Sequence, residues 1–172
     1  MIFAILAIFS PSARSSSEPQ VLLPCLADTA LIAAMEADAE SRRRVAELFD
    51  ELLENVPGTV EASYWTAVFA LALALTEQHE RLAALDLEGP SRWGVAARLV
   101  NQQRYAESAA ELAAIGGRPE EALARFLDAQ ALIRQGSRRE GESSLAVAVE
   151  LWAGMRATRY LDMAETLTAQ TA

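Results

Sequence analysis

The chain contains no lysine, one cysteine and one histidine among its 172 residues. Without lysine, no segment can match the phosphate-binding loop G-x-x-x-x-G-K-[ST], whose lysine contacts nucleotide phosphates. Cys25 alone excludes an internal disulfide and a cysteine-based metal cluster, and suits a reducing, cytoplasmic setting. His79 alone cannot supply the paired Glu-x-x-His motif of di-iron helical bundles. We therefore expect no catalytic residue, no cofactor and no metal site.

Positive charge is also scarce. The 15 arginines face 24 acidic residues, which gives a net charge of −9 and a pI of about 4.7. This balance opposes binding to nucleic acid or to an anionic membrane surface. Hydrophobic residues make up 52% of the chain, enough for a sizeable core, and one domain is the default at this length.

Residues 1–9 form an unbroken apolar run, and a stretch rich in serine follows it to Gln20. Nine helical residues span roughly 13 Å, too little for a bilayer, so no membrane partner is expected. The run fits a signal peptide poorly because it has no early positive charge. A remnant of an earlier helix or a misplaced start codon are the alternatives. We predict that residues 1–20 are a linker or remnant and that 21–172 form one helical domain.

The last third of the chain alternates helical patterns with glycine stops. Gly116 and Gly117 end one helix, and Pro119 suits the first turn of the next. Gly136 ends that helix, and Ser137 with Glu140 predicts a capping box for another. Gly154 is expected to break this one. A cap helix over about 158–169 should follow, with an inner stripe of Tyr160, Ala164 and Leu167.

The earlier chain also favours helices throughout. The expected ranges are 21–36 with Pro24 in its first turn, a helix capped by Asp38, 61–75, 77–85, 92–102 and 105–115. Residues 61–75 are apolar nearly all round, so this helix should be the most buried. No β-strand pattern is evident. Short loops predict antiparallel neighbours, and hence an all-α fold of antiparallel helical hairpins stacked as a short right-handed solenoid.

A spacing of 33 residues relates two of these hairpins. The turn at Gln103 aligns with that at Gly136, close to the ~34 residues of a tetratricopeptide unit. Small or core residues then coincide in the pairs Ala96 and Ala129, Ser108 and Gly141, and Leu112 and Leu145. With Ala148 and Trp152, these are the predicted repeat-packing residues. The pattern resembles tetratricopeptide repeats, although Leu99 and Leu132 occupy the position where that family usually has an aromatic residue.

A second resemblance covers residues 90–170. The segments 104–112, 118–122 and 157–165 are similar to the C-terminal helical-repeat region of large bacterial signalling ATPases, which carry adenylate-cyclase or DNA-binding output domains. The resemblance implies an interaction or regulatory scaffold, and a fragment or relative of such a regulator. Nothing in this chain matches the ATPase core of that family.

Other candidate sites have simpler structural interpretations. We expect His79 to be an exposed helix residue and Cys25 a buried, inert thiol. The acidic residues Glu47, Asp50, Glu51 and Glu54 share one outer helix face. Arg42, Arg43 and Arg44 should form i, i+4 pairs, Glu40 with Arg44 and Arg43 with Glu47. The three tryptophans fit packing between helices better than a ligand cage.

The sequence thus predicts a non-enzymatic, tetratricopeptide-like interaction module with a protein or peptide partner. Self-association through the N-terminal open end of the stack is a further possibility. The alternative is a helical sensor domain that binds a small ligand. A polar groove on the first helices would favour a peptide, and a closed apolar pocket would favour a small ligand.

Overall fold

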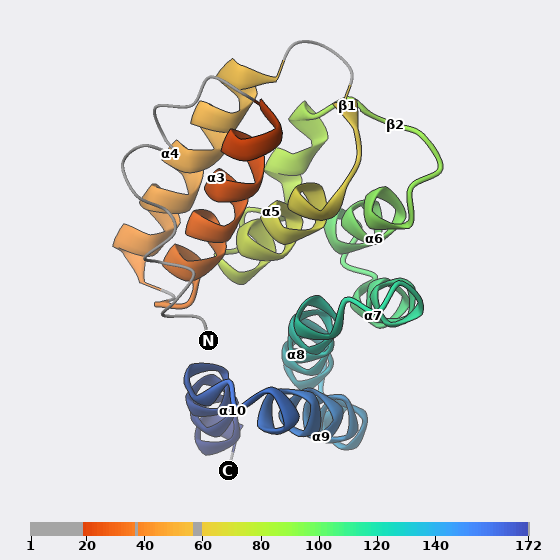
Figure 1. Cartoon of the computed structure of the whole chain (residues 1–172). Helices are drawn as coiled ribbons and strands as arrows, with labels where there is room; N and C mark the ends of the chain where they lie inside the picture. Colours follow the sequence, from red (N-terminus) through yellow and green to blue (C-terminus); the bar gives the residue numbers. More distant parts are fainter. Residues whose placement is uncertain (1–18, 37, 57–59, 172) are drawn as a thin grey trace. The chain divides into compact units, whose positions relative to one another are not determined.

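The computed structural model describes residues 19–36, 38–56 and 60–171, and these are almost entirely helical (Figure 1). The all-α class is therefore confirmed. The chain divides into two compact units, Met1–Gly89 and Pro90–Ala172, at the Gly-Pro step between them. Of the predicted linker 1–20, only Pro19 and Gln20 are described, and both are helical. One domain over 21–172 stays a prediction.

The first unit is built on α3 (Pro19–Ala34), which packs against both α4 (Ala39–Asn55) and α5 (Tyr64–Leu75). All residues of α5 from Trp65 to Ala74 are buried, which confirms its expected place in the core. Asp38 caps α4 as predicted, since its carboxylate accepts a hydrogen bond from the Ser41 N–H at 2.7 Å. Pro24 lies inside α3 rather than in its first turn, because the helix begins at Pro19.

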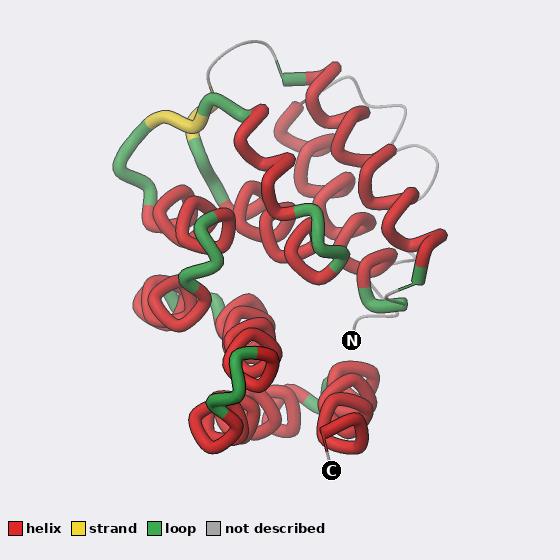
Figure 2. The backbone as a smooth tube through the Cα atoms, turned by 180° about the vertical axis from the view of Figure 1, so that it is seen from behind, coloured by secondary structure: helices red, strands yellow, loops and turns green. Residues whose placement is uncertain are grey.

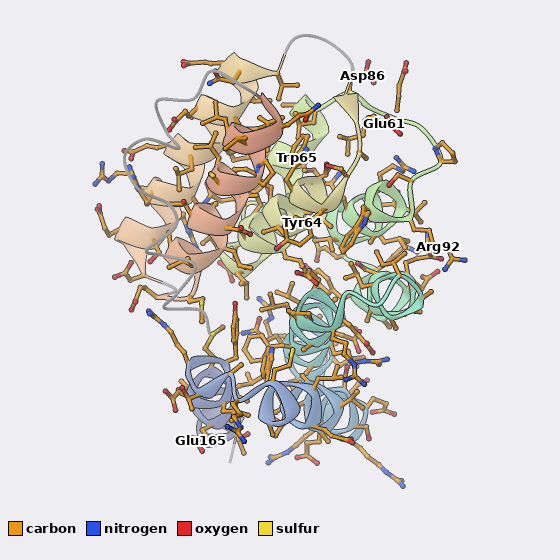
Figure 3. All side chains as sticks on the ribbon, viewed as in Figure 1. Glu61, Tyr64, Trp65, Asp86, Arg92 and Glu165 are labelled. Atoms are coloured by element: carbon orange, nitrogen blue, oxygen red, sulfur yellow. The ribbon has the colours of Figure 1, made fainter. Side chains whose placement is uncertain are left out.

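A short parallel strand pair corrects the expectation of no β-structure. β1 (Val60–Glu61) pairs with β2 (Leu87–Glu88), and the 3-10 helix η1 (His79–Ala84) lies between them in sequence. Two residues per strand leave no alternating pattern to detect. Glu61 lies opposite Glu88, and this pairing of like charges weakens the strand ladder. Glu61 and Asp86 both lie near the strand pair (Figure 3).

The second unit contains α6 (Arg92–Asn101), α7 (Tyr105–Ala114), α8 (Arg118–Arg134), α9 (Arg138–Met155) and α10 (Thr158–Thr171). Each helix packs against the next along the chain. The loops between them are short, as the tube in Figure 2 shows. In the described part of the chain, no helix has the length and apolar character needed to cross a membrane.

Four helices of this unit end with a residue in the left-handed conformation: Gln103, Gly116, Gly136 and Arg156. Two predicted helix signals are wrong. Gly154 does not break α9, which continues to Met155 and turns at Arg156 instead. Ser137 makes no side-chain cap to α9, because its backbone (φ −81°, ψ 55°) departs from the extended conformation that directs a cap hydroxyl to the helix N–H groups.

Candidate functional site

The predicted packing residues Ala96 and Ser108 touch across the α6–α7 pair. The Ser108 hydroxyl donates a hydrogen bond to the Ala96 carbonyl at 3.0 Å, and both residues are fully buried. A small residue on each helix permits this close backbone approach, and the hydroxyl is satisfied despite its burial. The α6–α7 pair is thus fixed by a polar contact inside an apolar interface.

The residues 33 positions later stand in the same relationship. Gly141 of α9 faces Ala129 of α8, and a Cβ atom placed on Gly141 would lie 3.0 Å from the Ala129 carbonyl oxygen. The same Cβ would lie 2.8 Å from Cγ1 of Ile133. The Ser108–Ala96 and Gly141–Ala129 contacts each join residues 12 apart in sequence, from a first helix to a second. The α8–α9 pair therefore repeats the contact of the α6–α7 pair, with glycine permitting an approach that excludes a side chain.

The turns within the two pairs also correspond at this spacing. The Arg104 N–H donates to the Leu99 carbonyl and the Ser137 N–H donates to the Leu132 carbonyl, both at 2.9 Å. These are the six-to-one bonds of a Schellman motif, closed by the left-handed residues Gln103 and Gly136. The pairs differ in length, since α6 and α7 have 10 residues each while α8 and α9 have 17 and 18.

The other predicted packing residues are all buried: Leu112, Leu145, Ala148 and Trp152. Trp152 is the centre of an aromatic cluster. Its ring is tilted against Phe126 of α8 with centroids 5.6 Å apart, and stacks on Tyr160 of α10 at 5.1 Å. Ala164 is also buried, whereas Tyr160 and Leu167 are half-buried. Of the inner stripe predicted for the cap helix, Tyr160 therefore contacts α9 and Ala164 is buried.

Two buried polar atoms in the described part of the second unit have no hydrogen-bond partner: Oδ1 of Asn101, on α6, and Nε1 of Trp152, on α9. Buried polar groups are almost always paired, so each such atom calls for an explanation. Asn101 lies at the end of α6 and is half-buried as a residue, although its Oδ1 atom is fully covered.

In the first unit, Asp28 of α3 and Tyr64 of α5 form a pair that the sequence did not suggest. The Tyr64 hydroxyl donates to Oδ1 of Asp28 at 3.1 Å. Burial raises the pKa of Asp28, and the hydrogen bond from Tyr64 opposes part of that shift. The only sequence signal for this pair was the lone carboxylate of Asp28 within the apolar run 21–34. Its partner Tyr64 lies 36 residues further along the chain.

The remaining candidates form no visible chemical site. Among the described residues, no group of three histidine, cysteine or acidic side chains could hold a metal ion. Cys25 is buried, as predicted, and His79 is partly covered rather than exposed. Arg43 binds both Glu40 and Glu47, so the predicted Arg43–Glu47 pair is confirmed, while Glu40 pairs with Arg43 rather than Arg44.

Charge is divided unevenly between the two units. Residues 1–89 contain 14 acidic side chains and five arginines, which accounts for the whole net charge of −9. Residues 90–172 contain ten acidic side chains and ten arginines. The second unit therefore has a formal net charge of zero.

No protein family model, no curated protein and no solved structure matches this chain significantly.

Proposed function

We propose that the chain is a non-enzymatic, tetratricopeptide-like interaction or regulatory scaffold module. The observation that carries the proposal is the repetition, 33 residues apart, of the Ser108–Ala96 contact as Gly141 over Ala129. Stacked helical repeats bury their apolar faces against neighbours and thereby build extended binding surfaces. A cytoplasmic setting and a relationship to a bacterial signalling regulator belong to the same proposal.

The first helices of the two pairs, α6 and α8, provide the proposed binding surface. Arg98 and Asn101 on α6 and Asp128 and Gln130 on α8 are half-exposed polar residues. These four side chains offer hydrogen-bond donors and acceptors to the backbone of a bound peptide. A polar surface of this kind favours a peptide or protein partner over an apolar small ligand.

Site-specific photo-crosslinking in the host cell tests the proposal. A photoreactive residue at Arg98 or Asp128 should capture a discrete protein partner, whereas the same residue at Ala146 or Glu150, exposed on α9, should capture none. Replacing Arg98 by alanine should weaken capture from Asp128, and replacing the exposed residue Gln102 should not. Equal capture from α8 and α9, or no adduct from any position, would contradict the proposed surface. Saturable ATP binding in calorimetry would contradict the non-enzymatic assignment.

A further inference from the structure

The turn between α9 and α10 holds a strained arginine where a glycine was available nearby. Arg156 adopts φ 56° and ψ 38°, the left-handed conformation. A residue with a Cβ atom is disfavoured there by a factor of about ten. Gly154 lies two residues earlier, yet it is part of the helix and exposed to solvent. The turn is thus made at a residue that resists it.

The same segment is well suited to a continuous helix. Only Arg156 and Ala157 separate α9 from α10, and no proline follows Pro119 in the sequence. Met155, Arg156 and Ala157 are all strong helix formers. Helical angles at both Arg156 and Ala157, neither of which belongs to a helix here, would relieve the strain at Arg156 and join α9 and α10 into one helix.

Straightening would separate the groups that α10 now covers. Tyr160 stacks on Trp152, which is 1% exposed, and Ala164 is also buried. In a continuous helix, residues eight positions apart lie about 12 Å from one another along the axis, so the two rings could not stay stacked within one chain. Each chain would then expose the surface around Trp152 that α10 covers in the monomer. The α10 of a second copy is complementary to that surface.

We propose that α10 exchanges between two copies of this chain, with Arg156 as the hinge. In the exchanged dimer, Tyr160 of each copy stacks on Trp152 of the other, and the contacts of the monomer are restored between chains. The strain at Arg156 is released in both copies. The exchange requires no other protein and does not depend on the proposed function.

Hinge variants test the exchange. The full chain is refolded from denaturant at high concentration, and its dimer constant is measured by analytical ultracentrifugation. Arg156→Gly removes the strain of the bent turn and disfavours the straight helix, so dimerisation should weaken about a hundredfold, tenfold for each hinge. Arg156→Val increases the strain of the bent turn and should strengthen dimerisation. Gln103→Gly is the matched control, because Gln103 is also left-handed but lies between α6 and α7, and it should leave the dimer constant unchanged.

Spin labels distinguish an exchanged dimer from a surface contact. Cysteines replace the exposed residues Ser143 and Glu165 in a Cys25→Ala background, and labelled chains are diluted with unlabelled ones. A continuous helix places these positions about 33 Å apart, and the bent monomer places them closer. A dimer with the long distance supports exchange. A dimer that keeps the monomer distance overturns it, and so does the absence of any dimer in the native chain and Arg156→Val. If Arg156→Val does not fold, equal dimer constants for the native chain and Arg156→Gly overturn it.

Discussion

Gly141 lies directly over the carbonyl of Ala129, so that a Cβ atom at this position would approach the oxygen to 3.0 Å. The corresponding pair 33 residues earlier is Ser108 and Ala96, joined by a hydrogen bond of 3.0 Å. A close contact from a second helix to a carbonyl of the first is therefore present twice, once with a hydroxyl and once with no side chain.

Replacing Gly141 by alanine should destabilise the second unit by about 1–3 kcal/mol, because the added methyl group overpacks the interface against Ala129 and Ile133. Gly154→Ala is the matched control in the same helix. No atom lies within 4 Å of its Cβ position, so alanine there should stabilise by about 0.5–1 kcal/mol. Denaturant unfolding measures both. Two equal, stabilising substitutions would show that Gly141 is not at a close contact.

Ser108→Ala should lower the free energy of unfolding by about 1 kcal/mol, because the buried hydrogen bond between α7 and α6 is lost. The control is Ser143→Ala, whose hydroxyl bonds to the Arg139 carbonyl on the exposed side of α9. Alanine at this position should be neutral or slightly stabilising because it favours the helix. Equal unfolding free energies for the two variants would contradict the structural role of Ser108.

The stacking of Tyr160 on Trp152 should stabilise the docking of α10. Tyr160→Ala removes this contact and should cost about 2 kcal/mol, less than for a fully buried ring because Tyr160 is half-buried. The emission of Trp152 should shift to the red, measured with Trp65 and Trp93 replaced by phenylalanine. Glu165→Ala, on the outer side of α10 (Figure 3), should change neither quantity. An unchanged spectrum for Tyr160→Ala would mean that α10 does not cover Trp152.

The Asp28–Tyr64 pair predicts a pH dependence of stability. Because the folded-state pKa of Asp28 is raised, the folded state binds its proton more tightly than the unfolded state does. The contribution of Asp28 is therefore most favourable below its unfolded pKa and is lost as the pH rises through the folded value. Asp28→Asn should stabilise the protein at neutral pH and remove this dependence. Tyr64→Phe should raise the pKa of Asp28 further, as an NMR titration would show; a lowered pKa would contradict the pairing.

Local signals in the sequence predicted much of the helical pattern. Gly116 and Gly136 mark helix ends because glycine readily adopts positive φ, and both occupy that conformation. Small residues at Ala96, Ser108, Ala129 and Gly141 marked the close approaches for a similar reason, since only short side chains fit there. These signals depend on a few neighbouring residues, which is why they are visible in a single sequence.

Features that depend on tertiary contacts were missed. α9 ends at Met155 and the chain turns at Arg156 rather than at Gly154, next to the stacking of Tyr160 on Trp152. The Asp28–Tyr64 pair joins residues 36 positions apart, and the β1–β2 pair joins residues 27 apart. No local propensity encodes such pairings, because each depends on how distant segments meet.

The repeat itself is tested most directly by placing serine at Gly141. If the α8–α9 contact is equivalent to that of α6–α7, the new hydroxyl can donate to the Ala129 carbonyl as Ser108 donates to Ala96. Gly141→Ser should then be less destabilising than Gly141→Ala by about 0.5–1 kcal/mol, the net worth of a buried hydrogen bond. Intrinsic helix propensity gives the opposite order, with alanine above serine, and Gly154 should follow that order. The measurement is the unfolding free energy of four variants, with serine or alanine at Gly141 and at Gly154. A higher unfolding free energy for serine than for alanine at position 141 alone supports the repeat. A higher unfolding free energy for alanine at both positions contradicts it.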